Sequence, residues 1–151
     1  MKIVLSLIIV FVIFYFGYFA INIYFAIPIC GQYVSKEITV GEKNITVELA
    51  DNDCKRELGL SGRTSLGKKQ GMLFVYQNDG SRGIWMKDMK FPIDILWINK
   101  DTEVVGIEWA ITPETYPKIF GEAYEAAFVL ELPVGFIKEN YISLGSKISI
   151  K

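Results

Sequence analysis

The sequence predicts a small, mainly β domain, either a β-sandwich or a barrel-like sheet with one or two short helices, preceded by an N-terminal transmembrane helix. Three observations support this prediction. The chain has 151 residues, which is enough for one domain and an appendage but not for two domains. An apolar run without any charged residue separates Lys2 from Lys36. After it come many short segments with the alternation or the apolar runs of β-strands, divided by turn residues.

The first segment has the length and composition of a membrane anchor. Residues 3–21 are apolar, and residues 23–29 extend the run after Asn22. A bilayer core needs about 20 apolar residues in helical form. A cleavable signal peptide has about 7–15, followed by a site of small residues that we do not find clearly here. We therefore expect an uncleaved anchor over residues 1–30 that contacts the lipid bilayer through residues 3–29. A cleaved signal peptide is the alternative.

The charges on either side of this run set its expected orientation. Lys2 and the amino terminus favour the cytoplasmic side under the positive-inside rule. We therefore expect a single-pass protein of a prokaryotic cell membrane whose C-terminal domain lies outside the cytoplasm. In this organisation residues 31–36 are a linker and residues 37–151 form the extracytoplasmic β domain.

The composition excludes several classes of function. With 16 basic and 17 acidic residues and no clustered basic face, the chain is not expected to bind nucleic acid. It has no histidine, the commonest metal ligand and the best proton carrier near neutral pH, and we expect neither metal nor cofactor. The two cysteines, Cys30 and Cys54, are too few for a disulfide framework. A bridge between them is one alternative, but we expect Cys54 to behave as a small, half-buried hydrophobe.

The elements of the first half follow from local patterns. Ile45, Val47 and Leu49 alternate with polar residues, which predicts a strand. Residues 51–53 offer an N-cap for a short helix at about 52–60, and glycines end that helix. Further strands are expected at 71–76 and, after a turn at 78–80, at 83–87.

The second half repeats this pattern of short strands and turns. Residues 93–98 carry apolar side chains on both faces, and a turn leads to a hairpin partner at 104–109. Residues 112–121 contain two prolines and are expected to form a loop. The remaining elements are a strand at 126–132, a turn or single helical turn at 134–140 and a final strand at 144–150.

No common catalytic motif is present, since the chain lacks G-x-S-x-G, a P-loop, G-x-G-x-x-G and C-x-x-C. The densest chemistry lies at residues 82–88 and 92–95, where two cations, a tryptophan and two carboxylates flank a turn. The candidate ligand-binding residues are Arg63, Arg82, Trp85, Lys87 and Asp94. The alternative, which physical chemistry alone favours, is a surface hairpin with a core tryptophan and solvated charges.

Asp94 needs an explanation in either case. Strand alternation places it on the same face as Leu96 and Ile98. A buried carboxylate requires hydrogen bonds or a cation. Its partners would be the cations of the candidate set or backbone N–H groups of the turn at 90–91. We favour a structural role in which Asp94 binds backbone.

Several motif blocks together resemble the uncharacterised family called domain of unknown function 192, over about residues 44–150. The blocks are Arg56-x-x-Gly59-Leu60-x-Gly62-Arg63-x-x-Leu66, Gly71-Met72-Leu73-Phe74, Trp85-Met86-Lys87, Pro92-Ile93-Asp94-Ile95 and Val129-Leu130-Glu131-Leu132-Pro133-x-Gly135. The chain departs from the family at Ser61, commonly Met, at Asp88-Met89, commonly Asn-Thr, and at Ser146, commonly Asp. The resemblance implies a mainly β, sandwich-like fold that is frequently exported, and it implies no activity.

Three functions remain open. The favoured one is a binding or accessory module of the cell envelope, not an enzyme, with a small-molecule or protein ligand. The second is an envelope hydrolase or lyase that works through carboxylates such as Asp94 with Glu108 or Glu131. The third is a structural subunit of a membrane complex. Two carboxyls facing each other across a cleft would favour the enzyme, whereas one buried acid beside a cation and a tryptophan would favour binding.

Overall fold

The computed structural model describes residues 30–150, and the predicted membrane segment at 3–29 lies outside the described residues. Within residues 30–150, no helix is long and apolar enough to cross a membrane. All the elements below belong to one compact unit that begins at Tyr33.

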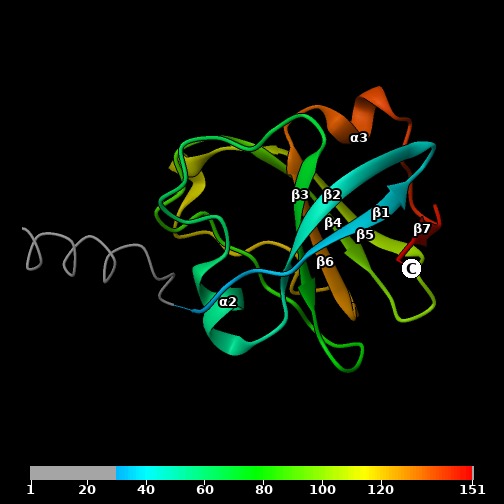
Figure 1. The fold of residues 1–151 in the computed structure, drawn as a ribbon, viewed down its shortest axis with the longest axis horizontal. Helices are drawn as coiled ribbons and strands as arrows, with labels where there is room; N and C mark the ends of the chain where they lie inside the picture. Colours follow the sequence, from blue (N-terminus) through cyan, green and yellow to red (C-terminus); the bar gives the residue numbers. More distant parts are fainter. Residues whose placement is uncertain (1–29, 151) are drawn as a thin grey trace, which may run out of the picture. The chain divides into compact units, whose positions relative to one another are not determined.

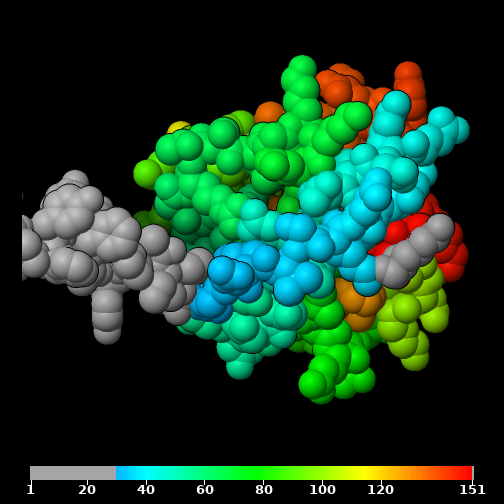
Figure 2. Space-filling view, viewed as in Figure 1, coloured from blue at the N-terminus to red at the C-terminus, as the bar shows by residue number. Residues whose placement is uncertain are grey.

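Seven strands form a single sheet in the order β5-β4-β6-β3-β2-β1-β7 (Figure 1). Their bounds are β1 Ser35–Val40, β2 Lys43–Ala50, β3 Gln70–Val75, β4 Ile93–Ile98, β5 Val104–Ile111, β6 Phe128–Pro133 and β7 Ile148–Ser149. The β2–β3 pair is parallel, whereas β1–β2, β3–β6, β4–β5, β4–β6 and β1–β7 are antiparallel. In the space-filling view, the blue and cyan residues of β1 and β2 form a band across the molecule beside the green segment that follows them (Figure 2).

The sheet curls until its two ends meet. Glu103, just before β5, bridges Lys147, just before β7. Next to this bridge the Gly145 N–H donates to the Val104 carbonyl at 2.8 Å, and the Val104 N–H donates to the Ser146 carbonyl at 2.9 Å. One curled sheet, rather than two packed sheets, confirms the barrel-like alternative of the sequence prediction.

Two short α-helices accompany the sheet, as predicted: α2 at Asp53–Leu58 and α3 at Phe136–Glu139. A 3₁₀ turn, η1, covers Pro113–Thr115 in the predicted loop. Asn52 caps α2, because its side-chain oxygen accepts a hydrogen bond from the Lys55 N–H at 2.9 Å. Gly59 ends the helix with a φ of 50°, a conformation that glycine adopts at little cost.

The apolar side chains form two cores, one on each face of the sheet. The inner core takes residues from every strand, for example Leu96 and Ile98 of β4, and α3 packs against it. The outer core includes Ile95 and Trp97 of β4, and it is covered by side chains from the long segments between strands, such as Met86. Central strands are therefore buried on both faces, and every residue of β4 is buried, Asp94 included.

Two predicted strands need correction, and one strand was not predicted. Residues 83–87 form no strand, because Ile84 makes only an isolated bridge to Phe120 and the segment covers the outer core instead. The predicted strand at 144–150 is reduced to β7, since Ser143–Ser146 forms a tight turn before it. β1 was not predicted, and it begins at Ser35, inside the range assigned to a linker.

The prediction for Cys54 is wrong. Both cysteines are disulfide-bonded, and Cys54 is exposed on α2 rather than half-buried. The inward-facing position of this helix belongs to Lys55, whose stem is buried while its ammonium binds the Asp51 carboxylate at 2.8 Å. In this helix the cysteine is therefore exposed and the lysine buried, the reverse of what their residue types suggest.

Candidate functional site

The five candidate residues do not converge on one point. Arg63 donates to both carboxylate oxygens of Glu48, at 2.9 and 2.6 Å, in a bidentate ion pair. This hydrogen bonding is the main reason why the pKa of Glu48 lies below its ordinary value. Arg82 holds loops together, because it donates to the Ala126 carbonyl at 3.1 Å and to the Asn78 carbonyl at 2.8 Å.

Trp85 and Lys87 lie together on the surface. Trp85 is 43% exposed, so the expectation of a core tryptophan at this position is wrong. Its ring meets Tyr116 edge to face at 6.0 Å, and the Lys87 ammonium lies 5.6 Å from the ring centroid. The buried tryptophan of the region is Trp97, whose indole N–H donates to the Arg82 carbonyl at 2.7 Å. Trp85 is therefore free to contact a ligand at the surface.

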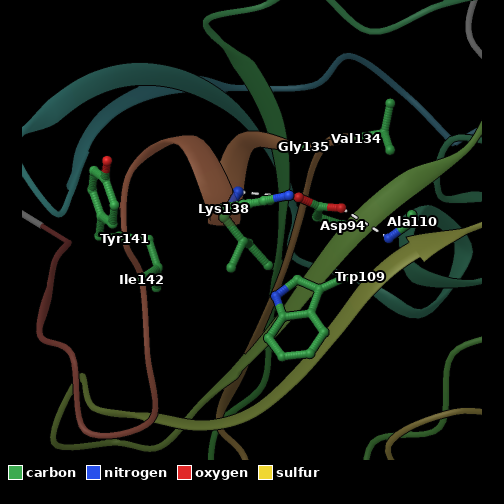
Figure 3. A pocket seen from close by; sticks show the side chains of 9 residues that line it. Asp94, Trp109, Ala110, Val134, Gly135, Lys138, Tyr141 and Ile142 are labelled. Atoms are coloured by element: carbon green, nitrogen blue, oxygen red, sulfur yellow. Dashed lines mark hydrogen bonds between the residues drawn. The ribbon is translucent and has the colours of Figure 1, made fainter.

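Asp94 is buried and binds backbone, as the structural alternative expected, but with different partners. One carboxylate oxygen accepts from the Ala110 N–H at 2.9 Å and the other from the Ile137 N–H at 3.0 Å (Figure 3). The β4–β5 register leaves Trp109 and Ala110 together opposite Asp94, which is a β-bulge. Ala110 has a φ of 49°, and the Asp94 carboxylate holds its N–H in this strained conformation.

The sequence reasoning named Glu131 only within the enzyme alternative, yet the structure makes it the most unusual charged residue of the domain. It lies in β6 and is 4% exposed, and its Oε2 atom is buried without a hydrogen-bond partner among the residues that the structure describes. Burial raises the pKa of Glu131 to about 8, and the nearby positive charge of Arg63 opposes this rise only in part. Glu131 is therefore mostly a neutral carboxylic acid at pH 7, able to donate a hydrogen bond.

Strand register places Glu131 in a row of side chains that crosses the outer face. The row runs from Glu48 in β2 through Met72, Glu131 and Ile95 to Glu108 in β5. Neighbouring strands lie about 4.8 Å apart, so successive carboxylates in the row are roughly 10 Å apart, with an apolar side chain between them. Asp94 points to the other face, because it precedes Ile95 in the same strand.

Glu131 lies at the wall of a small cavity of about 70 Å³. The lining also includes Arg56, Tyr76 and Trp85, together with the end of α2. Arg56 is held there by its hydrogen bond to the Val75 carbonyl at 2.8 Å and by its position 5.0 Å from the centre of the Tyr76 ring. The cavity thus combines one buried acid, one cation and one exposed tryptophan. Its volume suits a small polar group or a few water molecules, since one water needs about 10–15 Å³ of such space.

Two larger cavities lie between β5 and the segment after α3. One of about 450 Å³ is bordered by Trp109, Ile137 and Tyr141, with Asp94 at its floor (Figure 3). The other, of about 460 Å³, continues from Trp109 to Leu144. Within residues 30–150, no group of three or more acidic residues or cysteines is placed to hold a metal ion.

Comparison with known proteins supports one family. The profile of domain of unknown function 192, described as an uncharacterized group, matches residues 36–150. No curated protein is significantly similar to the chain.

Two solved structures share the fold. One, from Sinorhizobium meliloti 1021, is described as a candidate transcription regulator and has a TM-score of 0.72 and 29% identity, over 78% of this chain and 95% of that one. The other, a protein of unknown function from Novosphingobium aromaticivorans DSM 12444, has a TM-score of 0.69 and 27% identity, over 81% of this chain and 89% of that one. Because the family profile spans all seven strands except the first residue of β1, the chain belongs to the uncharacterised family called domain of unknown function 192.

Proposed function

We propose that this protein is a membrane-anchored, extracytoplasmic binding module of the cell envelope that holds a polar group of its ligand on the Glu131 carboxyl. The observation that carries the proposal is the buried Oε2 atom of Glu131, which has no hydrogen-bond partner among residues 30–150, in a residue that lines a cavity. A polar atom left without a partner costs roughly 1–3 kcal/mol, and a ligand that supplies the partner recovers that free energy.

The arrangement of acids favours binding over hydrolysis. Glycoside cleavage needs two carboxyls that face one space, about 5–9.5 Å apart. Asp94 and Glu131 lie on opposite faces of the sheet, and Ile95 separates Glu131 from Glu108. Arg56 and Trp85 line the same cavity as Glu131 instead, which is the combination expected of a binding site.

The chemistry of the cavity limits the ligand. A neutral carboxylic acid donates to a carbonyl or hydroxyl oxygen, and Arg56 is already engaged by the Val75 carbonyl. Since the cavity has a volume of only about 70 Å³, a small part of the ligand enters it, and the rest of the ligand lies over the exposed ring of Trp85. The ligand class is therefore an uncharged molecule with an exposed carbonyl or hydroxyl group, such as a peptide amide or a sugar.

The proposed location rests on the sequence and the cysteines. The apolar segment at 3–29 and Lys2 favour an anchor with the domain outside the cytoplasm. The disulfide-bonded state of both cysteines agrees with an oxidising compartment. The net charge of −1 gives no support to nucleic-acid binding.

A thermal-shift screen of peptide amides and sugars at pH 6 tests the proposal, with wild type beside Glu131→Gln and Glu131→Leu. Gln keeps a hydrogen-bond donor at this position and Leu does not. A true ligand stabilises wild type and the Gln variant but not the Leu variant. Raising the pH above 8 weakens its binding to wild type alone. A ligand that stabilises the Leu variant equally, or a panel without any ligand, contradicts the proposal.

A further inference from the structure

The barrel-like sheet is closed along only part of its seam. At the closed end, Val104 hydrogen-bonds to Gly145 and Ser146. Beyond Val104, within the described residues, the backbone of β5 has no hydrogen bonds except those to β4 and the one to the Asp94 carboxylate. Residues 105–109 therefore present a free strand edge, which is a template for pairing with another chain.

An apolar groove follows this free edge. Its two parts, of about 450 and 460 Å³, adjoin at Trp109 and Ile142 between β5 and the segment after α3. Trp109 is 63% exposed, Leu144 65% and Tyr141 92%. Large apolar side chains gathered beside a free edge are typical of a binding surface.

Asp94 fixes both walls of this groove. Its carboxylate accepts one hydrogen bond from Ala110 in β5 and one from Ile137 in α3, and the two walls thus share one buried anchor (Figure 3). Because both walls are already fixed in the free protein, a ligand binds without the entropy cost of ordering them.

The free edge decides what kind of occupant fits. A lipid chain in the groove would cover the N–H and C=O groups of β5 without bonding to them, which is unfavourable for each group. An extended polypeptide satisfies these groups by adding a strand. Pairing stops at Ala110, because its N–H already binds Asp94.

The charge of the groove adds a second constraint. Apart from the anchored Asp94, Lys138 is the charged residue that lines it, and Lys138 forms no salt bridge within residues 30–150. It borders the groove at the Ala110 end, where strand pairing stops. We propose that this groove docks the apolar C-terminal segment of a partner protein, which pairs with β5 as an added strand and places its terminal carboxylate on Lys138.

Peptide pools test this proposal on the full-length protein in lipid nanodiscs. The probes are acetylated hexapeptides in which Val, Ile, Leu or Phe alternates with Ser or Thr. One pool ends in a free carboxylate, a second in an amide, and a third carries N-methyl groups on alternate residues. We expect selection from the carboxylate pool, about tenfold weaker binding of the matching amides, and none from the N-methylated pool. Hydrogen exchange of residues 105–109 slows when a selected peptide binds.

Single variants assign the contacts. Lys138→Gln lowers the affinity for carboxylate peptides about tenfold and leaves the amides unchanged, whereas Lys100→Gln, a surface lysine in the β4–β5 turn, changes neither. Trp109→Ala weakens binding of both pools, and its thermal unfolding shows whether it folds, as its exposure leads us to expect. Selection of no peptide, equal binding of acids and amides, or equal binding of the N-methylated pool overturns the proposal. So does a wild-type dimer that Trp109→Ala makes monomeric, because a second copy would then fill the groove.

Discussion

The buried acid Glu131 gives the protein a pH dependence that one substitution removes. Its pKa is raised from 4.5 to about 8 in the folded protein, mainly by burial. Between these two values the folded state keeps a proton that the unfolded chain releases, so stability is fully present below pH 4.5 and falls as the pH rises towards 8. At about 1.4 kcal/mol per pH unit, the loss over the whole window is on the order of 5 kcal/mol, comparable to the stability of many small domains.

Few other ionisable groups change the stability between pH 4.5 and pH 8. The chain has no histidine, so no other side chain titrates between pH 5 and 8 at its ordinary pKa. The pKa values of Glu48 and Asp51 are lowered by their hydrogen bonds to Arg63 and Lys55, so the stability that these acids contribute is lost only as the pH falls below about 4.5. The pKa of Tyr76 is raised above 10 by burial.

Urea denaturation at pH 5, 6, 7 and 8, followed by tryptophan fluorescence, measures the effect. Wild type should lose stability steadily with rising pH, whereas Glu131→Gln should be nearly independent of pH in this range. Glu37→Gln, an exposed acid on β1, serves as the matched control and should follow wild type. A flat or rising wild-type profile, or the same slope in Glu131→Gln, would refute the reasoning about Glu131.

Three further predictions follow from the described contacts and from the sequence. Asp94→Ala should destabilise the domain by about 1–3 kcal/mol for each buried N–H that it leaves unpaired. Asp94→Asn should destabilise it less, since one acceptor remains. Equal urea midpoints for both variants and wild type would exclude the anchoring role. Neither cysteine should react with maleimide before reduction, and both should react in unfolded, reduced protein, so that labelling of the native, unreduced chain would contradict the disulfide-bonded state. Intact mass of protein extracted from membranes should include residues 1–29, and loss of the first 20–30 residues would rule out the uncleaved anchor.

The sequence was sufficient wherever short-range periodicity decides the outcome. It placed β4 at residues 93–98, its hairpin partner after the turn at 99–102, and a capped helix near residues 52–60. It also placed Asp94 on the same face as Leu96 and Ile98. The structure confirms these predictions, because alternation along a strand and capping of a helix depend on neighbours in the chain.

The candidate sites depended on contacts that no local pattern encodes. In the sequence, Glu131 is one acid in an apolar strand, and its missing partner and raised pKa appear only when α2 and the segment around Trp85 enclose it. The groove exists because the seam between β5 and the end of the chain closes at Val104 and not beyond it. Local periodicity thus determined which face a side chain takes. Strand register and the covering segments bring together residues that are far apart in the chain, and they decided which residues that side chain contacts.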